Sequence, residues 1–187
     1  MKSRIFAKFS HSALSAALAS VVALAGAGLV SNAHAAAATS TATSVVIAPI
    51  AITAPAVLSF GRFAHGAGGS VTISNSGVRT SSGVILSSTS SVQTAARFDV
   101  TGDGSATYAI THSGATVLSD SAIIPNTMAL ATTSDLTGGN VTTGNVATGT
   151  LTTGGTQSIF VGGTLTVGAN QVAGTYTGAV TVTVEYN

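Results

Sequence analysis

Few side chains beyond residue 35 could do acid–base or metal chemistry, and they are scattered. His65 and His112 each lie near a predicted turn. Asp99 and Asp103 are four residues apart, a spacing that does not direct both carboxylates at one site where a strand leads into a turn. The chain contains no cysteine, which excludes thiolate nucleophiles, thiolate metal sites and disulfides. We therefore predict no enzyme activity, no metal and no cofactor.

Other binding motifs are also weak. Glycine pairs are frequent, but none is expected between a strand and a helix, where a phosphate cradle would form. The aromatic side chains beyond residue 35 are few, and we expect them to fill a core. A carbohydrate site on exposed aromatic side chains stays open as an alternative. These residues are Phe60, Phe63, Phe98, Tyr108, Phe160, Tyr176 and Tyr186.

The N-terminus has the pattern of an export signal. A basic start that includes Lys2 and Lys8 precedes a mostly apolar stretch, Ala13–Val30, and Ala33-His34-Ala35 then supplies a small-x-small cleavage pattern. We predict that residues 1–35 are a signal peptide. A membrane anchor is the alternative, but the stretch is alanine-rich and only weakly hydrophobic. The protein is then exported through the periplasm to the cell surface, with no permanent membrane span.

The exported part is poor in charge. It has three arginines, no lysine and five acidic residues, a net charge near −2. Such a surface has no electrostatic means of holding nucleic acid, so we predict no nucleic-acid partner.

The elements between these residues are predicted to be short strands. Alternating runs are separated by clusters of Gly, Asn, Asp and Ser, as in an all-β fold, and we favour an immunoglobulin-like β-sandwich. The composition of residues 133–145 also allows a mobile loop. The expected strands are Val45–Thr53, Val57–Phe60, Ser70–Ser74, Val84–Ser88, Ala96–Thr101, Ala106–Thr111, Thr127–Thr132, Asn145–Thr152, Gln157–Val167 and Thr175–Tyr186.

The last fourteen residues have the clearest pattern. After Gly174, apolar or small residues occupy the even positions, and threonine or glutamate occupies the odd ones except at Ala179 and the final Asn187. A period of two predicts a strand with one buried and one solvated face. About twelve residues at roughly 3.3 Å each would give a strand of about 40 Å. The even positions are Tyr176, Gly178, Val180, Val182, Val184 and Tyr186.

The segment after the predicted cleavage site is apolar on both faces. One face of Val45–Thr53 carries Val46, Ala48, Ile50 and Ile52, and the other also lacks charge. Such a strand is normally buried on both sides, while Pro49 favours an edge position. We predict that residues 36–53 are a donor strand that completes the sandwich domain, residues 54–187, of a neighbouring subunit. The alternative is that the segment folds back as the first strand of its own sandwich.

Both ends of the chain resemble those of chaperone–usher pilus subunits. These commonly end in an alternating strand with a penultimate aromatic residue, as at Tyr186, and a glycine fourteen residues from the end, as at Gly174. The stretch Gly163–Gly178 looks like an uncharacterised family of exported pilin-like β-domains. The ending is similar to spore-coat-U-like subunits of archaic pili, and Val45–Thr53 followed by Leu58-Ser-Phe-Gly61 matches that family's opening. Many such subunits carry a disulfide, which this chain cannot form.

This resemblance implies a structural subunit of a bacterial surface filament, a fimbria or pilus, assembled by donor-strand complementation. Its partners would be other copies of the chain, a periplasmic chaperone and an outer-membrane usher. The donor side chains would be Val46, Ala48, Ile50 and Ile52. The acceptor groove and chaperone-recognition strand would comprise Gly174, Tyr176, Val180, Val182, Val184, Tyr186 and Asn187. The alternative function is a non-polymerising exported β-sandwich, such as an adhesin or matrix protein.

Overall fold

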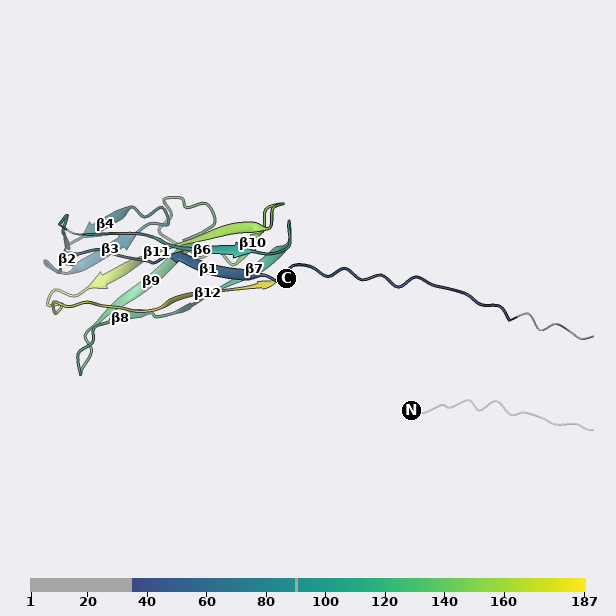
Figure 1. The fold of residues 1–187 in the computed structure, drawn as a ribbon. Helices are drawn as coiled ribbons and strands as arrows, with labels where there is room; N and C mark the ends of the chain where they lie inside the picture. The colour runs from purple at the N-terminus through teal and green to yellow at the C-terminus, as the bar shows by residue number, and fades with distance from the viewer. Residues whose placement is uncertain (1–34, 90) are drawn as a thin grey trace, which may run out of the picture. The chain divides into compact units, whose positions relative to one another are not determined.

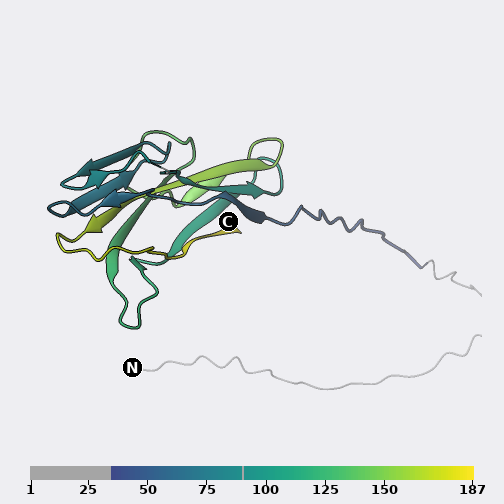
Figure 2. The ribbon, with the colours of Figure 1, turned by 60° about the vertical axis from the view of Figure 1, so that its left-hand side comes forward.

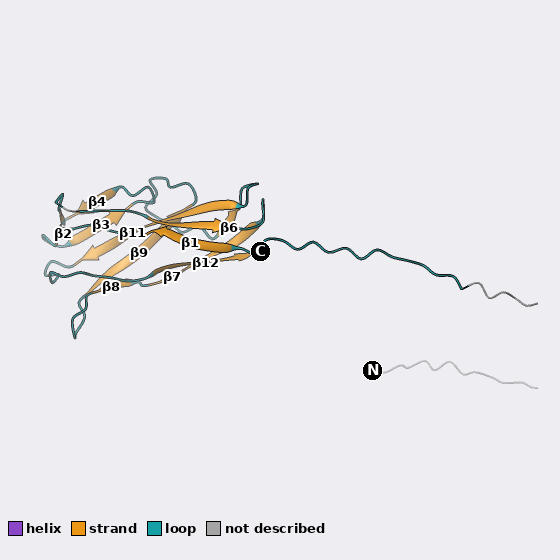
Figure 3. Cartoon of the chain, in the orientation of Figure 1, coloured by secondary structure: helices purple, strands orange, loops and turns teal. Residues whose placement is uncertain are grey.

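The computed structural model describes residues 35–89 and 91–187, and the predicted signal peptide lies outside them except for Ala35. The chain divides between Thr43 and Ser44 into two units. Residues 35–43 are exposed and contain no helix or strand. In the described residues of Ser44–Asn187 the regular secondary structure consists of β-strands alone, as Figure 3 shows. Within the described residues no helix has the length and apolar character needed to cross a membrane.

The fold is an all-β sandwich built from antiparallel pairs. The larger sheet has the order β1-β6-β11-β3-β4, with β9 paired to β11 and β8 paired to β9. The smaller sheet has the order β10-β7-β12, and β2 pairs with β5. The strands are β1 (Ala51–Ala56), β2 (Phe63–Ala64), β3 (Gly69–Ile73), β4 (Arg79–Ser82), β5 (Ile85–Leu86), β6 (Ala96–Thr101), β7 (Thr107–Gly114), β8 (Val117–Ser119), β9 (Thr127–Asp135), β10 (Thr148–Thr150), β11 (Thr156–Val167) and β12 (Val180–Tyr186).

The longest strand, β11, organises the larger sheet (Figure 1). Its first half pairs with β6 and its second half with β3, while β9 pairs with its middle. Phe160 pairs with residues of both β6 and β9, so these two strands lie on opposite edges of β11. The strand that carries Asp99 therefore lies beside the centre of the sheet.

Two apolar clusters make up the core. The first lies where β6 and β11 face β7 and β12, and includes Phe98, Tyr108, Ile159 and Val182. The second gathers residues of β3, β9 and β11 with Phe60 and Val84. Alternation along the strands explains this core, because every second side chain of β6 is buried and every second side chain of β12 is buried or half-buried. Leu58 and Val180 pack against both clusters and so join them.

Most strand predictions are confirmed, but Val57–Phe60 forms only an isolated bridge at Ser59, and both terminal strands differ from expectation. Ala96–Thr101 is observed as predicted, the strand predicted at 70–74 lies one residue earlier at both ends, and the strand predicted at 157–167 begins one residue earlier. The last strand begins at Val180 rather than Thr175, so the prediction of a twelve-residue strand is wrong. The first strand begins at Ala51 rather than Val45.

Residues 133–145 are not simply a mobile loop. Thr133–Asp135 end β9 and are buried. The Asp135 carboxylate accepts hydrogen bonds from the Gly138 and Gly139 amides, both at 2.9 Å, which order the start of the loop.

The connection between β8 and β9 projects from the sandwich, as Figure 2 shows.

Candidate functional site

The last strand, β12, is an open edge of the smaller sheet. It pairs with β7 along all seven of its residues, from Val180 opposite Gly114 to Tyr186 opposite Tyr108. Among the described residues no strand pairs with its other edge. Val182 and Val184 are buried, whereas Thr181, Thr183 and Glu185 are exposed. The predicted assignment of faces is therefore confirmed for this strand.

The other edge strands are short or interrupted. In the described part of the chain β4 has four residues, and β8 and β10 have three each. The edge strand β1 has six residues, but its register shifts between Thr53 and Ala56, around Pro55. Proline, bulges and short length are the usual protections of sheet edges against pairing with another chain. β12 has none of them, and Glu185 is its one charged residue.

An apolar groove of about 160 Å³ lies at the start of β12. Its lining comes from four separate stretches of sequence, which supply Leu58, Phe60, Leu118, Leu130, Tyr176, Thr177, Gly178 and Val180. Since Leu58 and Val180 join the two core clusters, the groove lies beside the place where the clusters meet. Most of its lining side chains are leucine, phenylalanine or valine.

Two glycines of the terminal pattern have different surroundings. A Cβ at Gly178 would lie 2.8 Å from Leu118 Cδ2 and 2.9 Å from Ala115 Cβ, so this position has no room for a side chain. A Cβ at Gly174 would have no neighbour closer than 3.8 Å. Gly174 lies outside both β12 and the groove lining, so the structure does not place it with the predicted acceptor residues.

Tyr176 lines the groove without belonging to β12. Its hydroxyl donates to the Val172 carbonyl at 2.7 Å and accepts from Gln171 Nε2 at 2.8 Å. Thr177 beside it forms an isolated bridge with Ser119. The residues before Val180 are thus held by loop contacts rather than by a continuous strand.

Two predicted donor residues, Ile50 and Ile52, pack within their own chain. Both lie against the cluster that contains Val182 and Val184, and Ile52 pairs with Val100 of β6. A strand with two apolar faces can be buried in its own domain as well as in another, so their role as side chains given to another subunit stays a prediction. The alternative of a self-supplied first strand holds in this structure for Ala51–Ala56.

The other two predicted donors are not packed. Val46 is 93% exposed and its neighbour Val45 is 87% exposed. Ala48 is exposed as well, and its carbonyl accepts a hydrogen bond of 2.9 Å from the Tyr186 hydroxyl. Ser44–Pro49 therefore leaves apolar side chains in solvent instead of filling the open edge of β12.

Tyr186 ties the two ends of the domain together. Besides donating to Ala48, its hydroxyl accepts a 2.6 Å hydrogen bond from the Asp103 amide. The ring is half-buried against the first core cluster. The predicted acceptor residue thus lies where the N-terminal segment enters the domain, and Asn187 after it donates its amide to the Thr107 carbonyl.

The two histidines have different surroundings. His65 is exposed, and its Nδ1 lies 2.9 Å from the Gly66 carbonyl. His112 lies on β7 opposite Val182. Its Nε2 is buried with no hydrogen-bond partner among the described residues, and burial lowers its pKa. Neither residue lines the groove. Within the described residues no group of three His, Cys, Asp or Glu side chains could hold a metal ion.

These observations define a β-sandwich of two facing sheets, one of which has an unprotected edge beside a groove. Residues 50–186 match the model of the DUF4402 family, a domain of unknown function, and the chain belongs to this family. Comparison with curated proteins gives no match.

Proposed function

We propose that this protein is a structural subunit of a bacterial surface filament, a fimbria or pilus, assembled by donor-strand complementation. The observation that carries the proposal is the open edge of β12. It is seven residues long, regular and almost uncharged, whereas the other described edge strands are short or interrupted. A bare edge of this kind is a template for pairing with another strand.

The proposed occupant is the N-terminal segment, residues 36–47, of a second copy. This segment has no charged residue. Its Val45 and Val46 are almost fully exposed, and Ile47 is half exposed. Twelve extended residues reach about 40 Å, enough to follow all of β12 and enter the groove. The donor therefore ends before Ala48 rather than at Thr53.

The energy of such pairing is appreciable. Burying a valine or isoleucine side chain contributes about 1.5–3 kcal/mol, so two or three of them add several kcal/mol to the hydrogen bonds of the new ladder. The total stability of a domain is only about 5–15 kcal/mol. Donation would thus change both the stability and the assembly state of the subunit.

Export and the assembly partners belong to the same proposal. Residues 1–35 act as a signal peptide, and a periplasmic chaperone holds the open edge until an outer-membrane usher exchanges it for the next subunit's segment. The mature protein then lies on the cell surface in an immunoglobulin-like fold completed in trans. The support for these partners is the open edge and the basic, apolar and small-x-small pattern of the N-terminus.

The test places charge on both faces of the proposed donor. Val46→Asp together with Ile47→Asp should abolish the concentration-dependent multimers of the mature protein, measured by light scattering after size-exclusion chromatography. The matched control, Thr142→Asp with Thr143→Asp, adds the same charge at exposed positions outside the proposed donor and outside β12, and should assemble. A native protein that stays monomeric and ignores an added peptide of residues 36–50 would refute the proposal.

A non-polymerising exported sandwich is the second candidate. The packing of Ile50 and Ile52 against their own core favours it, because part of the predicted donor already completes its own larger sheet. On this reading the exposed Val45 and Val46 would have no partner strand. The charge variants would then leave every property of the protein unchanged except solubility.

A further inference from the structure

A second hollow, unrelated to the groove beside β12, lies on the larger sheet. It has a volume of about 540 Å³, within the range of about 300–1,000 Å³ that small-molecule sites occupy. It shares no lining residue with the apolar groove. We call it the polar recess. It is lined chiefly by Arg97, Asp99, Thr101, Thr156, Ser158 and Phe160.

The register of β6 and β11 places these side chains together. Arg97 lies opposite Phe160, Asp99 opposite Ser158, and Thr101 opposite Thr156. Directly paired residues project from the same face of a sheet. The residues between them, such as Phe98 and Ile159, are buried in the core. The recess therefore lies on the outward face of the sheet, and its residues are held by two neighbouring strands.

Its charged pair is positioned but only partly engaged. Arg97 Nε and Ser158 Oγ both donate to Asp99 Oδ1 at 2.7 Å. No hydrogen bond to another described residue involves Asp99 Oδ2 or the terminal nitrogens of Arg97. Burial by itself would raise the pKa of Asp99, but the hydrogen bonds from Ser158 and Arg97 and the Arg97 charge hold it below its ordinary value. The recess thus presents an ionised acceptor beside free donors.

The recess also contains an apolar ring. Phe160 is half-buried, and a Cβ at Gly138 would lie 3.4 Å from three atoms of the ring. Gly138 has a φ of 65°, a conformation that favours glycine, so the loop can approach the ring closely. Arg97 lies opposite Phe160 in the β6–β11 register, and the ring and the Arg97–Asp99 pair line the same recess.

This combination suits a sugar better than an anion. Adjacent hydroxyl groups of a sugar can each donate and accept, so they match a carboxylate beside a guanidinium. The C–H face of the ring can pack on an aromatic side chain. An anion would meet the Asp99 carboxylate. Only eight acidic or basic side chains follow residue 35, and two of them meet in this recess.

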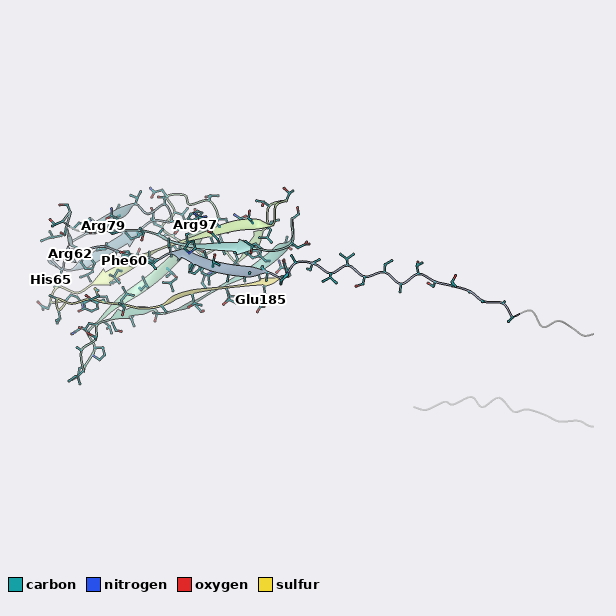
Figure 4. The ribbon with its side chains drawn as sticks, viewed as in Figure 1. Phe60, Arg62, His65, Arg79, Arg97 and Glu185 are labelled. Atoms are coloured by element: carbon teal, nitrogen blue, oxygen red, sulfur yellow. The ribbon has the colours of Figure 1, made fainter. Side chains whose placement is uncertain are left out.

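We propose that the polar recess binds neutral saccharide residues, with Asp99 and Arg97 holding vicinal hydroxyl groups and Phe160 supporting the ring. This inference does not depend on filament assembly. Figure 4 labels Arg97 beside the larger sheet and Glu185 on β12, on different sheets of the sandwich. Glu185 therefore supplies a carboxylate remote from the recess for comparison.

The test titrates the isotope-labelled protein with the methyl glycosides of glucose, mannose, galactose and N-acetylglucosamine, one at a time. Chemical shifts of backbone amides in β6 and β11 should change with at least one of them, with a dissociation constant in the millimolar range. Absence of binding at tens of millimolar, or shifts confined to other strands, would overturn the proposal. Shifts caused by sodium sulfate and by none of the glycosides would reveal an anion site and overturn it too.

Two variants locate the binding. Asp99→Asn should weaken binding of the active glycoside about tenfold or more, whereas Glu185→Gln makes the same chemical change elsewhere and should leave it unaltered. Phe160→Leu keeps an apolar side chain but removes the ring face, and should weaken binding several-fold. Equal affinities of the Asp99→Asn and Glu185→Gln proteins, or unaltered binding by folded Phe160→Leu, would show that the recess is not the site.

Discussion

β1 and β12 are neighbouring edge strands of the two facing sheets, and their free edges differ in how well they are protected against pairing with another strand (Figure 1). β1 contains Pro55 and a register shift, and its Ile52, like Ile50 just before the strand, already packs on the core. β12 runs for seven residues without proline, bulge or lysine. One edge is closed to a new strand, and the other is open.

The contrast has a consequence for assembly. If β12 accepts a strand and residues 36–47 supply one, donor and acceptor are different surfaces of the same subunit. Contacts of this heterologous kind produce rings when the rotation closes and open filaments when it does not. The closed edge at β1 then prevents a second, competing mode of strand pairing. The proposed filament would therefore grow in one mode only.

The largest expected effect separates the self-packed part of the N-terminal segment from the exposed part. Ile52→Ala should lower the free energy of unfolding of the monomer by about 2–3 kcal/mol, because Ile52 packs on the core. Val46→Ala should change it by less than about 0.5 kcal/mol and should weaken multimers instead. Urea unfolding of dilute protein measures both.

A stable Ile52→Ala monomer that no longer assembles would contradict the assignment of Ile52 to the self-packed part of the segment. It would place Ile52 in the donated strand of another copy, as the sequence pattern alone predicts. The comparison of β1 with β12 would then lose its basis, because β1 would not be a permanent part of its own sheet.

The next largest effect is expected at Gly178, just before β12 begins. Gly178→Ala should destabilise the fold by about 1–2 kcal/mol, since the added methyl group would meet Leu118, Ala115 and the Val117 carbonyl. Gly174→Ala is the matched control and should change the melting temperature little. Equal sensitivity of the two positions would indicate that Gly174 has a role that the open surroundings of its Cα do not explain.

A smaller effect concerns the contact between Tyr186 at the end of β12 and the segment that precedes β1. Tyr186→Phe removes the hydroxyl that accepts from the Asp103 amide and donates to the Ala48 carbonyl. We expect a loss of about 1 kcal/mol in stability and faster motion of Ser44–Ile50 in NMR relaxation. Unchanged relaxation of that segment would mean that Tyr186 does not position the entry of the N-terminal segment into the domain.

Alternation in the sequence was sufficient to assign the faces of Val180–Tyr186, since one face is buried and the other solvated. It failed before Val180 because an extended loop can continue the same period of two, as Tyr176 and Gly178 do. It could not decide the partner of Ile50 and Ile52, whose apolar character is the same whether that partner is their own domain or another. The groove could not be predicted, because its walls come from distant segments, and neither could the polar recess, which depends on the register of β6 with β11.

The smallest expected effect is a pH dependence that belongs to β7, the partner of β12. Burial holds the pKa of His112 below its ordinary value of 6.5 in the folded protein, so the unfolded chain binds more protons between the two values. The free energy of unfolding should therefore be unaffected by His112 above about pH 6.5 and should decline as the pH falls toward the pKa of His112 in the folded protein. Urea unfolding at several pH values measures this. His112→Gln should flatten the slope of stability against pH, whereas His65→Gln, at an exposed turn, retains the slope due to His112.

The lowered pKa values of Asp99 and Asp120 affect stability only near and below their ordinary value of 3.8, outside this window. Because His112 lies opposite Val182, an unchanged slope in His112→Gln would mean that β7 and β12 open locally to water, and the edge of β12 would then be a fraying strand instead of a preformed acceptor.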